Sequence, residues 1–188
     1  MIDTEEDIRR CYSVLRSRLS LDKPLTLLHI GADRTVIATA SNVLVLPIWT
    51  EKTGMESFHH APPTPAEIEN AINVVEDEVT RAHKMTGTGS ILCTTDDSIR
   101  EIAHLAGVPD QPEMRLNRDA MESLFTRLAA LSTGRPAAKD NLRVDSSFSA
   151  ALLILREFMF HLGFTFINIT SGDKITQQNE PSKNLYHP

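Results

Sequence analysis

Three apolar segments in the first 50 residues, joined by very short polar turns, constrain the fold more than any other feature of the sequence. Residues 25–30, 35–40 and 43–49 are rich in β-branched and aliphatic side chains, which is typical of strands. The connections at residues 31–33 and 41–42 contain turn-forming residues such as glycine, aspartate and asparagine. Because strands joined this closely pair antiparallel, the sequence predicts an antiparallel three-strand meander.

Helical patterns flank the meander. Residues 4–20 carry apolar side chains at helical spacing, with Thr4 as a candidate cap and acidic residues in the first turn. Thr64 and Glu67 match a capping box, and Pro65 fits the first helical position after it. Further helices are predicted over residues 98–107, 117–131 and 146–162.

Two more strands and three connections complete the expected order. The strand over residues 90–95 is short and apolar, which suits a buried parallel position, and a last strand is expected over residues 164–170. Residues 50–63, 109–115 and 134–145 are polar or contain prolines and glycines, so we expect loops there.

The order of these elements indicates a fold class. Three hairpin strands followed by a helix and a further strand describe a ribonuclease-H-like half-domain, of which actin-like ATPases contain two. We therefore expect an α/β domain in which helices pack on a mixed sheet that includes the antiparallel meander. This single domain is expected over residues 1–177, with the first helix as an addition and residues 178–188 as a C-terminal tail.

Charge and cysteine usage narrow the possible partners. The 188 residues carry a net charge of −6 without a dense Lys/Arg cluster, which argues against nucleic acid and anionic membrane as partners. No apolar run reaches the roughly 18–20 residues of a membrane span, and four of residues 3–7 are acidic, unlike the start of a signal peptide. Cys11 and Cys93 are expected to be buried free thiols, with no zinc-binding spacing. A cytoplasmic location is expected.

Two stretches carry a resemblance to a known family. The first joins the helix start at residues 64–69 to ILCTTDDSIREIA at residues 91–103, and the second joins residues 151–155 to INITSG at residues 167–172. Both are similar to the N-terminal domain of the exopolyphosphatase and guanosine-pentaphosphate phosphohydrolase (Ppx/GppA) family. In that family the strand matching residue 91 runs into an Ala-Thr-Ser-Ala-x-Arg turn. The resemblance implies an actin-like, ribonuclease-H-like fold.

The residues that handle metal and phosphate in that family are altered here. Its first strand ends in Asp-x-Gly-Ser-Asn, whereas this chain has HIGAD at residues 29–33, so that His29 replaces the acid. Asp96 and Asp97 stand where the family has Thr-Ser, and carboxylates repel a polyanion. The family's second glycine-rich loop and its catalytic glutamate lie in a middle region that has no counterpart in this chain. The resemblance therefore implies a degenerate, phosphatase-like domain with no catalytic residues, although enzyme activity stays an open question.

Four residues would serve an alternative function. A residual phosphohydrolase, or a nucleotide- or phosphate-binding protein, would use Mg²⁺ and the side chains of Asp33, Asp96, Asp97 and Arg100. A small-ligand sensor with a pocket beside the same strand ends is a third possibility.

Each of these residues also has a purely structural interpretation. Asp97 and Ser98 can cap the helix that follows, with Glu101 completing a second capping box. Arg100 can form an ion pair with a nearby acid. The adjacent His59 and His60, even with His29 and Asp33, make a poor chelating set, so we expect neither a metal site nor a cofactor.

The most apolar helix, over residues 146–162, suggests a partner. Its large apolar side chains extend over more than one face, and such a surface needs a cover. The preferred hypothesis is a non-catalytic domain that acts through protein–protein contact, as a homodimer. The competing cover is the helix over residues 4–20, packed on the same face within one chain.

Overall fold

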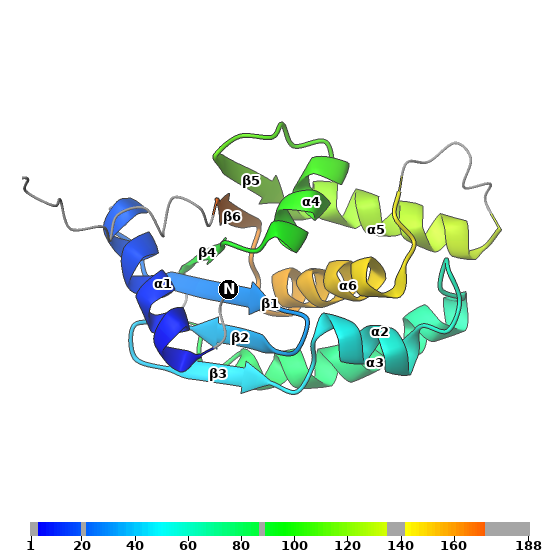
Figure 1. Ribbon diagram of the computed structural model, residues 1–188, viewed down its shortest axis with the longest axis horizontal. Coiled ribbons are helices and arrows are strands. Elements are labelled where there is room, and N and C mark those ends of the chain that lie inside the picture. The colour runs from blue at the N-terminus through cyan, green and yellow to red at the C-terminus, as the bar shows by residue number, and fades with distance from the viewer. Residues whose placement is uncertain (1–3, 20–21, 87–88, 135–141, 172–188) are drawn as a thin grey trace, which may run out of the picture.

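One mixed sheet organises the molecule. The computed structural model describes residues 4–19, 22–86, 89–134 and 142–171 (Figure 1). Its six strands are β1 (Leu25–Ile30), β2 (Thr35–Ala38), β3 (Val43–Leu46), β4 (Ile91–Thr94), β5 (Glu113–Asn117) and β6 (Phe166–Thr170). They are ordered β3-β2-β1-β4-β6-β5 across the sheet. The helices are α1 (Glu5–Leu19), α2 (Thr50–Ser57), α3 (Pro65–Ala82), α4 (Asp97–Leu105), α5 (Arg118–Ser132) and α6 (Ser146–His161).

The predicted meander and its extension are confirmed. β1 pairs antiparallel with β2, and β2 pairs antiparallel with β3. β4 is parallel to β1 and β6 is parallel to β4, so the last strand joins the same sheet as the meander. The capping box at Thr64 and Glu67 is present at the start of α3, with Pro65 at its first position. The tail expected at residues 178–188 lies outside the described residues.

The segment 50–63 was expected to be a loop, but α2 occupies its first half. The glycine within α2 lowers its helix propensity, so tertiary contacts must hold the helix. Thr50 anchors its start by donating backbone and hydroxyl hydrogen bonds to the carbonyl oxygen of Gly31. Gly54 then lies so close to Ser146 at the start of α6 that a Cβ would come within 3.2 Å of its backbone. Close packing against α6 therefore outweighs the weak local signal.

The segment 109–115 is not only a linker, because β5 begins within it and pairs antiparallel with β6 at the sheet edge. Its burial alternates: Met114 and Leu116 are buried, while Glu113, Arg115 and Asn117 are exposed. The prolines that precede it masked this short period-2 pattern, which is typical of a strand with one covered face.

Helices cover both faces of the sheet, but very unequally (Figure 1). Of the described helices, α1 packs on one face, where Ile8, Cys11 and Leu15 form a cluster with side chains of β1, β2 and β4. The other face carries α6, which α2, α3, α4 and α5 surround. In the part of the chain that the structure describes, no helix is both long and apolar enough to cross a bilayer.

Neither a second copy of the chain nor the helix over residues 4–20 covers α6 in this structure; α2, α3, α4 and α5 do. The buried residues of α6 include Phe148, Leu152, Leu153, Ile154, Leu155, Phe158 and Met159. Helices of the same chain supply their cover, so the breadth of the apolar surface does not by itself require a second molecule. The competing cover, α1, lies on the opposite face of the sheet and belongs to a separate core cluster.

Candidate functional site

The sheet topology brings together two residues that lie far apart in sequence. β1 and β4 are parallel neighbours, so their carboxyl ends meet at one edge of the sheet, the usual location of functional groups in open α/β sheets. His29 lies in β1 one residue before its end, and Asp96 follows β4. The His29 Nδ1 and Asp96 Oδ1 atoms are 2.6 Å apart. The Ile30 backbone N–H donates to the other oxygen of Asp96, at 2.7 Å.

The expected capping of α4 by a side chain is wrong. Asp96 holds the N-cap position of α4, but its carboxylate makes no capping hydrogen bond because both oxygens face β1. The capping box expected at Ser98 and Glu101 does not form, and the Glu101 carboxylate instead pairs with Arg143, 2.9 Å away.

Electrostatics favour the charged form of the His29–Asp96 pair. Burial alone would lower the pKa of His29, but the hydrogen bond to Asp96 and the negative charges of Asp96 and Asp33 raise that pKa above its ordinary value. Both side chains are largely buried. The pair is therefore a buried imidazolium–carboxylate ion pair over a wider pH range than a free histidine would allow.

Gly31 closes the turn that carries His29. Its N–H donates to the Arg34 carbonyl oxygen at 2.8 Å. A Cβ at position 31 would be 2.8 Å from His29 Nε2, so this close approach needs glycine. Asp33, in the same turn, is exposed and bonds Arg34 at 2.7 Å, which lowers the pKa of Asp33.

Arg100 is occupied by structure, as its ion-pair interpretation predicts. Its Nη1 atom is 3.0 Å from the Asp110 carboxylate, and its N–H groups also donate to the carbonyl oxygens of Gln111 and Pro112. These bonds fasten α4 to the segment that leads into β5. The guanidinium therefore holds the fold together at this edge.

Within the described residues, no side-chain hydrogen bond or ion pair joins the four candidate residues to one another, although Asp33 and Asp96 both act electrostatically on His29. Asp96 is buried against His29, Asp33 and Asp97 are exposed, and Arg100 faces Asp110. His59 and His60 belong elsewhere: the His59 N–H and the His60 ring both contact the Glu67 carboxylate. Partial burial would raise the pKa of Glu67, but hydrogen bonds from Thr64, His60 and His59 lower it to about 2. Among residues 4–19, 22–86, 89–134 and 142–171, no three potential metal-binding side chains gather together.

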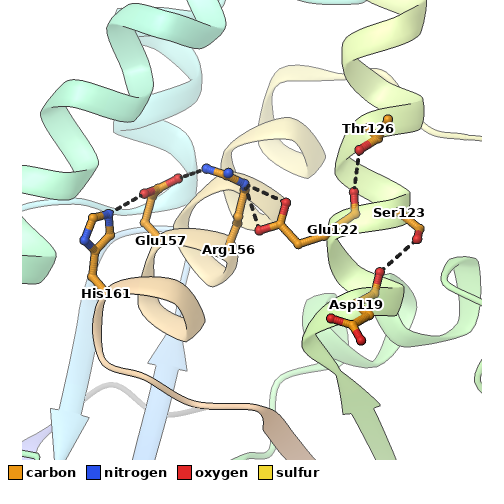
Figure 2. Close-up of polar contacts among 7 residues, drawn as sticks. All are labelled: Asp119, Glu122, Ser123, Thr126, Arg156, Glu157 and His161. Carbon is orange, nitrogen blue, oxygen red and sulfur yellow. Dashed lines mark hydrogen bonds and ion pairs between the residues drawn. The ribbon is translucent and has the colours of Figure 1, made fainter.

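A partly buried chain of polar side chains joins α6 to α5, and sequence reasoning missed it. Figure 2 shows His161, Glu157 and Arg156 along α6, with Glu122 reaching toward them from α5. The buried Glu157 carboxylate accepts from Arg156 Nη1 at 2.5 Å and lies 3.0 Å from His161 Nε2. Arg156 Nε is 3.2 Å from Glu122. On α5 the hydroxyls of Ser123 and Thr126 bond carbonyl oxygens one turn earlier. The signal available was a charged Arg-Glu pair inside the most apolar helix.

Comparisons with known proteins place this fold. No protein-family model matches the chain, and no curated protein does. The Aquifex aeolicus Ppx/GppA phosphatase, in its type II variant, superposes with a TM-score of 0.73 at 15% identity, over 87% of this chain and 58% of that one. Another crystal structure of the Aquifex aeolicus family member superposes with a TM-score of 0.71 at 16% identity, over 92% of this chain and 63% of that one. An exopolyphosphatase from Cytophaga hutchinsonii superposes with a TM-score of 0.63 at 14% identity, over 87% of this chain and 59% of that one.

The fold is that of the Ppx/GppA phosphatase structures. The architecture expected from the order of the elements, actin-like and ribonuclease-H-like, is thereby confirmed, and so is the structural resemblance to that family. This chain spans 58–63% of the length of those three structures. Within the Ppx/GppA-like fold, the end of β1 carries a histidine where the family resemblance implies an acid.

Proposed function

We propose that this Ppx/GppA-like domain is not a phosphohydrolase and acts through contact with another protein. The observation that supports the first half is the position of Asp96. This carboxylate is the buried one among the candidates at the strand ends, and both of its oxygens already accept hydrogen bonds, from His29 and from the backbone. A metal ion there would have to compete with an ion pair formed inside the protein.

Charge near the strand ends supports the same proposal. Phosphoryl transfer depends on positioned cations and metal ions that neutralise the charge of the phosphoryl group. Here Arg100 is held by Asp110 and by carbonyl oxygens, whereas Asp97 is exposed to solvent. An approaching phosphate would meet that carboxylate and no free arginine at position 100.

An assay of phosphate release tests the loss of catalysis. The purified chain with Mg²⁺ or Mn²⁺ should release no phosphate from polyphosphate or guanosine pentaphosphate above the buffer rate, because Asp96 and Arg100 are already bound within the protein. Asp33→Ala and Asp97→Ala variants serve as controls. Metal-dependent turnover that the Asp33→Ala change abolishes would contradict the proposal and favour residual phosphohydrolase activity.

The second part of the proposal is that the protein contacted is a second copy of this chain, in a homodimer. The edge strand β3 supports it. The two outer edges of the sheet differ: β5 exposes Glu113 and Arg115, whereas β3 contains no charged residue and leaves Val45 59% exposed. Natural edge strands usually carry charges that prevent pairing with another chain. Two copies of β3 placed antiparallel about a twofold axis would pair the backbone groups that no described strand pairs, and they would meet without like-charge repulsion.

The variant Val45→Lys tests this interface. Sedimentation at micromolar concentration should show a dimer of the 20.9 kDa wild-type chain and a monomer for Val45→Lys, because lysine on an edge strand opposes pairing. Val74→Lys is a matched control, since Val74 is the same residue type and is 54% exposed, but it belongs to α3 and not to the edge strand. A monomeric wild type, or a dimeric Val45→Lys, would refute the proposed interface.

A reducing compartment, the cytoplasm, is the location that we propose. Cys11 and Cys93 lie in the same core cluster yet remain free thiols. Burial raises the pKa of both, that of Cys93 to about 12, so each stays protonated and unreactive. Unpaired buried cysteines are usual in cytosolic proteins.

A further inference from the structure

A cavity of about 680 Å³ opens at the edge of the sheet opposite to the His29–Asp96 pair. It lies beside the amino ends of β4 and β6, and its walls include Leu19 at the end of α1, Ile91, Leu162 and Phe164. This volume falls in the range of about 300–1,000 Å³ that small-molecule sites occupy. The site expected for a small ligand was beside the carboxyl ends of the strands, so this cavity is a different one.

The charged groups of the cavity are all basic. Lys23, His83 and Arg115 line it, and among the described residues no aspartate or glutamate does, although the whole chain carries a net charge of −6. Within the described residues, these three side chains form neither an ion pair nor a hydrogen bond. Glu113, two residues before Arg115, lies 4.0 Å from Arg18 instead.

Arg115 is held in place without losing its donors. Its guanidinium carbon lies 3.7 Å from the centre of the Phe166 ring, so the planar group stacks on the aromatic face. Stacking occupies a face of the guanidinium and leaves its edge, where the N–H groups point, available for a carboxylate or phosphate. Phe166 is itself 38% exposed.

A neutral polar group completes the lining. The Asn168 amide donates from Nδ2 to the Leu92 carbonyl oxygen at 3.2 Å. This bond fixes the side chain in one orientation and leaves its own carbonyl oxygen as an acceptor. Apolar walls, a few convergent polar groups and a fixed arginine are the features of small-molecule sites.

We propose that this cavity binds a small organic anion. A carboxylate or phosphate group faces Lys23, His83 and Arg115, and a flat apolar body packs against the aromatic and aliphatic walls. The inference does not depend on the homodimer or on the loss of catalysis. A structural explanation competes with it: Lys23 and His83 follow the ends of α1 and α3, where cations stabilise the helix dipole. That explanation predicts changes in stability but no saturable anion binding.

Titration calorimetry on the full chain distinguishes anion binding from the structural explanation. The probes are 2-naphthoate and phenyl phosphate, each paired with a neutral counterpart of similar shape, 2-naphthamide and phenol. At least one anion should bind saturably with a dissociation constant below about 1 mM, and its neutral counterpart should bind at least about tenfold more weakly, because charge-assisted hydrogen bonds are lost.

Variants locate the binding in the cavity. Arg115→Gln should weaken binding of the anion at least about tenfold, whereas Arg9→Gln, on the exposed first turns of α1, should leave it unchanged. Lys23→Gln provides a second test in case Arg115→Gln fails to fold. The proposal is overturned if neither anion binds, if the neutral compounds bind equally well, or if folded variants at both positions keep the wild-type affinity.

Discussion

Replacing Phe158 by alanine should lower the free energy of unfolding by about 3–5 kcal/mol, the usual cost of removing a fully buried aromatic side chain. Phe158 is 0% exposed, and it lies in the last turn of α6, the helix that four others surround. Because a domain is stable by only about 5–15 kcal/mol, this change removes a large part of the total. Urea denaturation followed by circular dichroism measures it.

Phe160→Ala is the matched control for Phe158→Ala. The two residues have the same type and lie two positions apart on α6, but Phe160 is 55% exposed. Its removal should change the free energy of unfolding by less than about 1 kcal/mol, since exposed sites are usually tolerant. Equal losses from both variants would mean that α6 is not covered as the structure has it, and would restore this helix as a candidate interface.

Replacing Asp96 by alanine should cost about 3–5 kcal/mol near pH 6, because breaking a buried ion pair leaves a charge without compensation. The change removes the partner of His29 and also leaves the Ile30 N–H without its acceptor. Asp97→Ala is the control: the neighbouring residue is the same acid but exposed, so its loss should have little effect. Similar values for the two variants would contradict the buried ion pair.

The effect of Asp96→Ala should depend on pH in a defined direction. The folded protein raises the pKa of His29, so the ion pair contributes its full stability below the unfolded pKa of about 6.5. That contribution is lost as the pH rises through the higher pKa of the folded state. Denaturation curves at pH 6 and pH 9.5 should therefore show a larger difference between wild type and variant at the lower pH. A difference that grows with pH would contradict this assignment.

Elements with strong local signals were predictable, and those that depend on packing were not. The short connections between β1, β2 and β3 fix their antiparallel order, and the Thr64–Glu67 capping box fixes the start of α3. By contrast, α2 contains Gly54 in its middle and forms because that glycine permits close packing on α6. β5 exists because β6 offers it an edge. Neither partner is visible in the local sequence.

The candidate site shows the same division. The substitution of histidine for an acid at position 29 is readable from the sequence, as are the two acids that follow β4. Their pairing is not, since 67 positions separate His29 from Asp96 and only the parallel contact of β1 and β4 joins them. A prediction that β1 and β4 pair in parallel would have placed their carboxyl ends, and with them His29 and Asp96, at the same edge of the sheet. The charged Arg-Glu pair in α6 is also readable, but its bond to Glu122 is not, because that bond needs the contact between α5 and α6.

The His29–Asp96 bond also has an evolutionary consequence. If an ancestor carried an acid at position 29, as the resemblance implies, a single reversion of His29 to aspartate would now set two carboxylates against each other where the present atoms are 2.6 Å apart. A single change at Asp96 would leave the buried His29 side chain without its partner. Each residue thus makes the ancestral state at the other position deleterious, so the path back requires two simultaneous substitutions. Selection for fold stability alone would keep this lineage from returning.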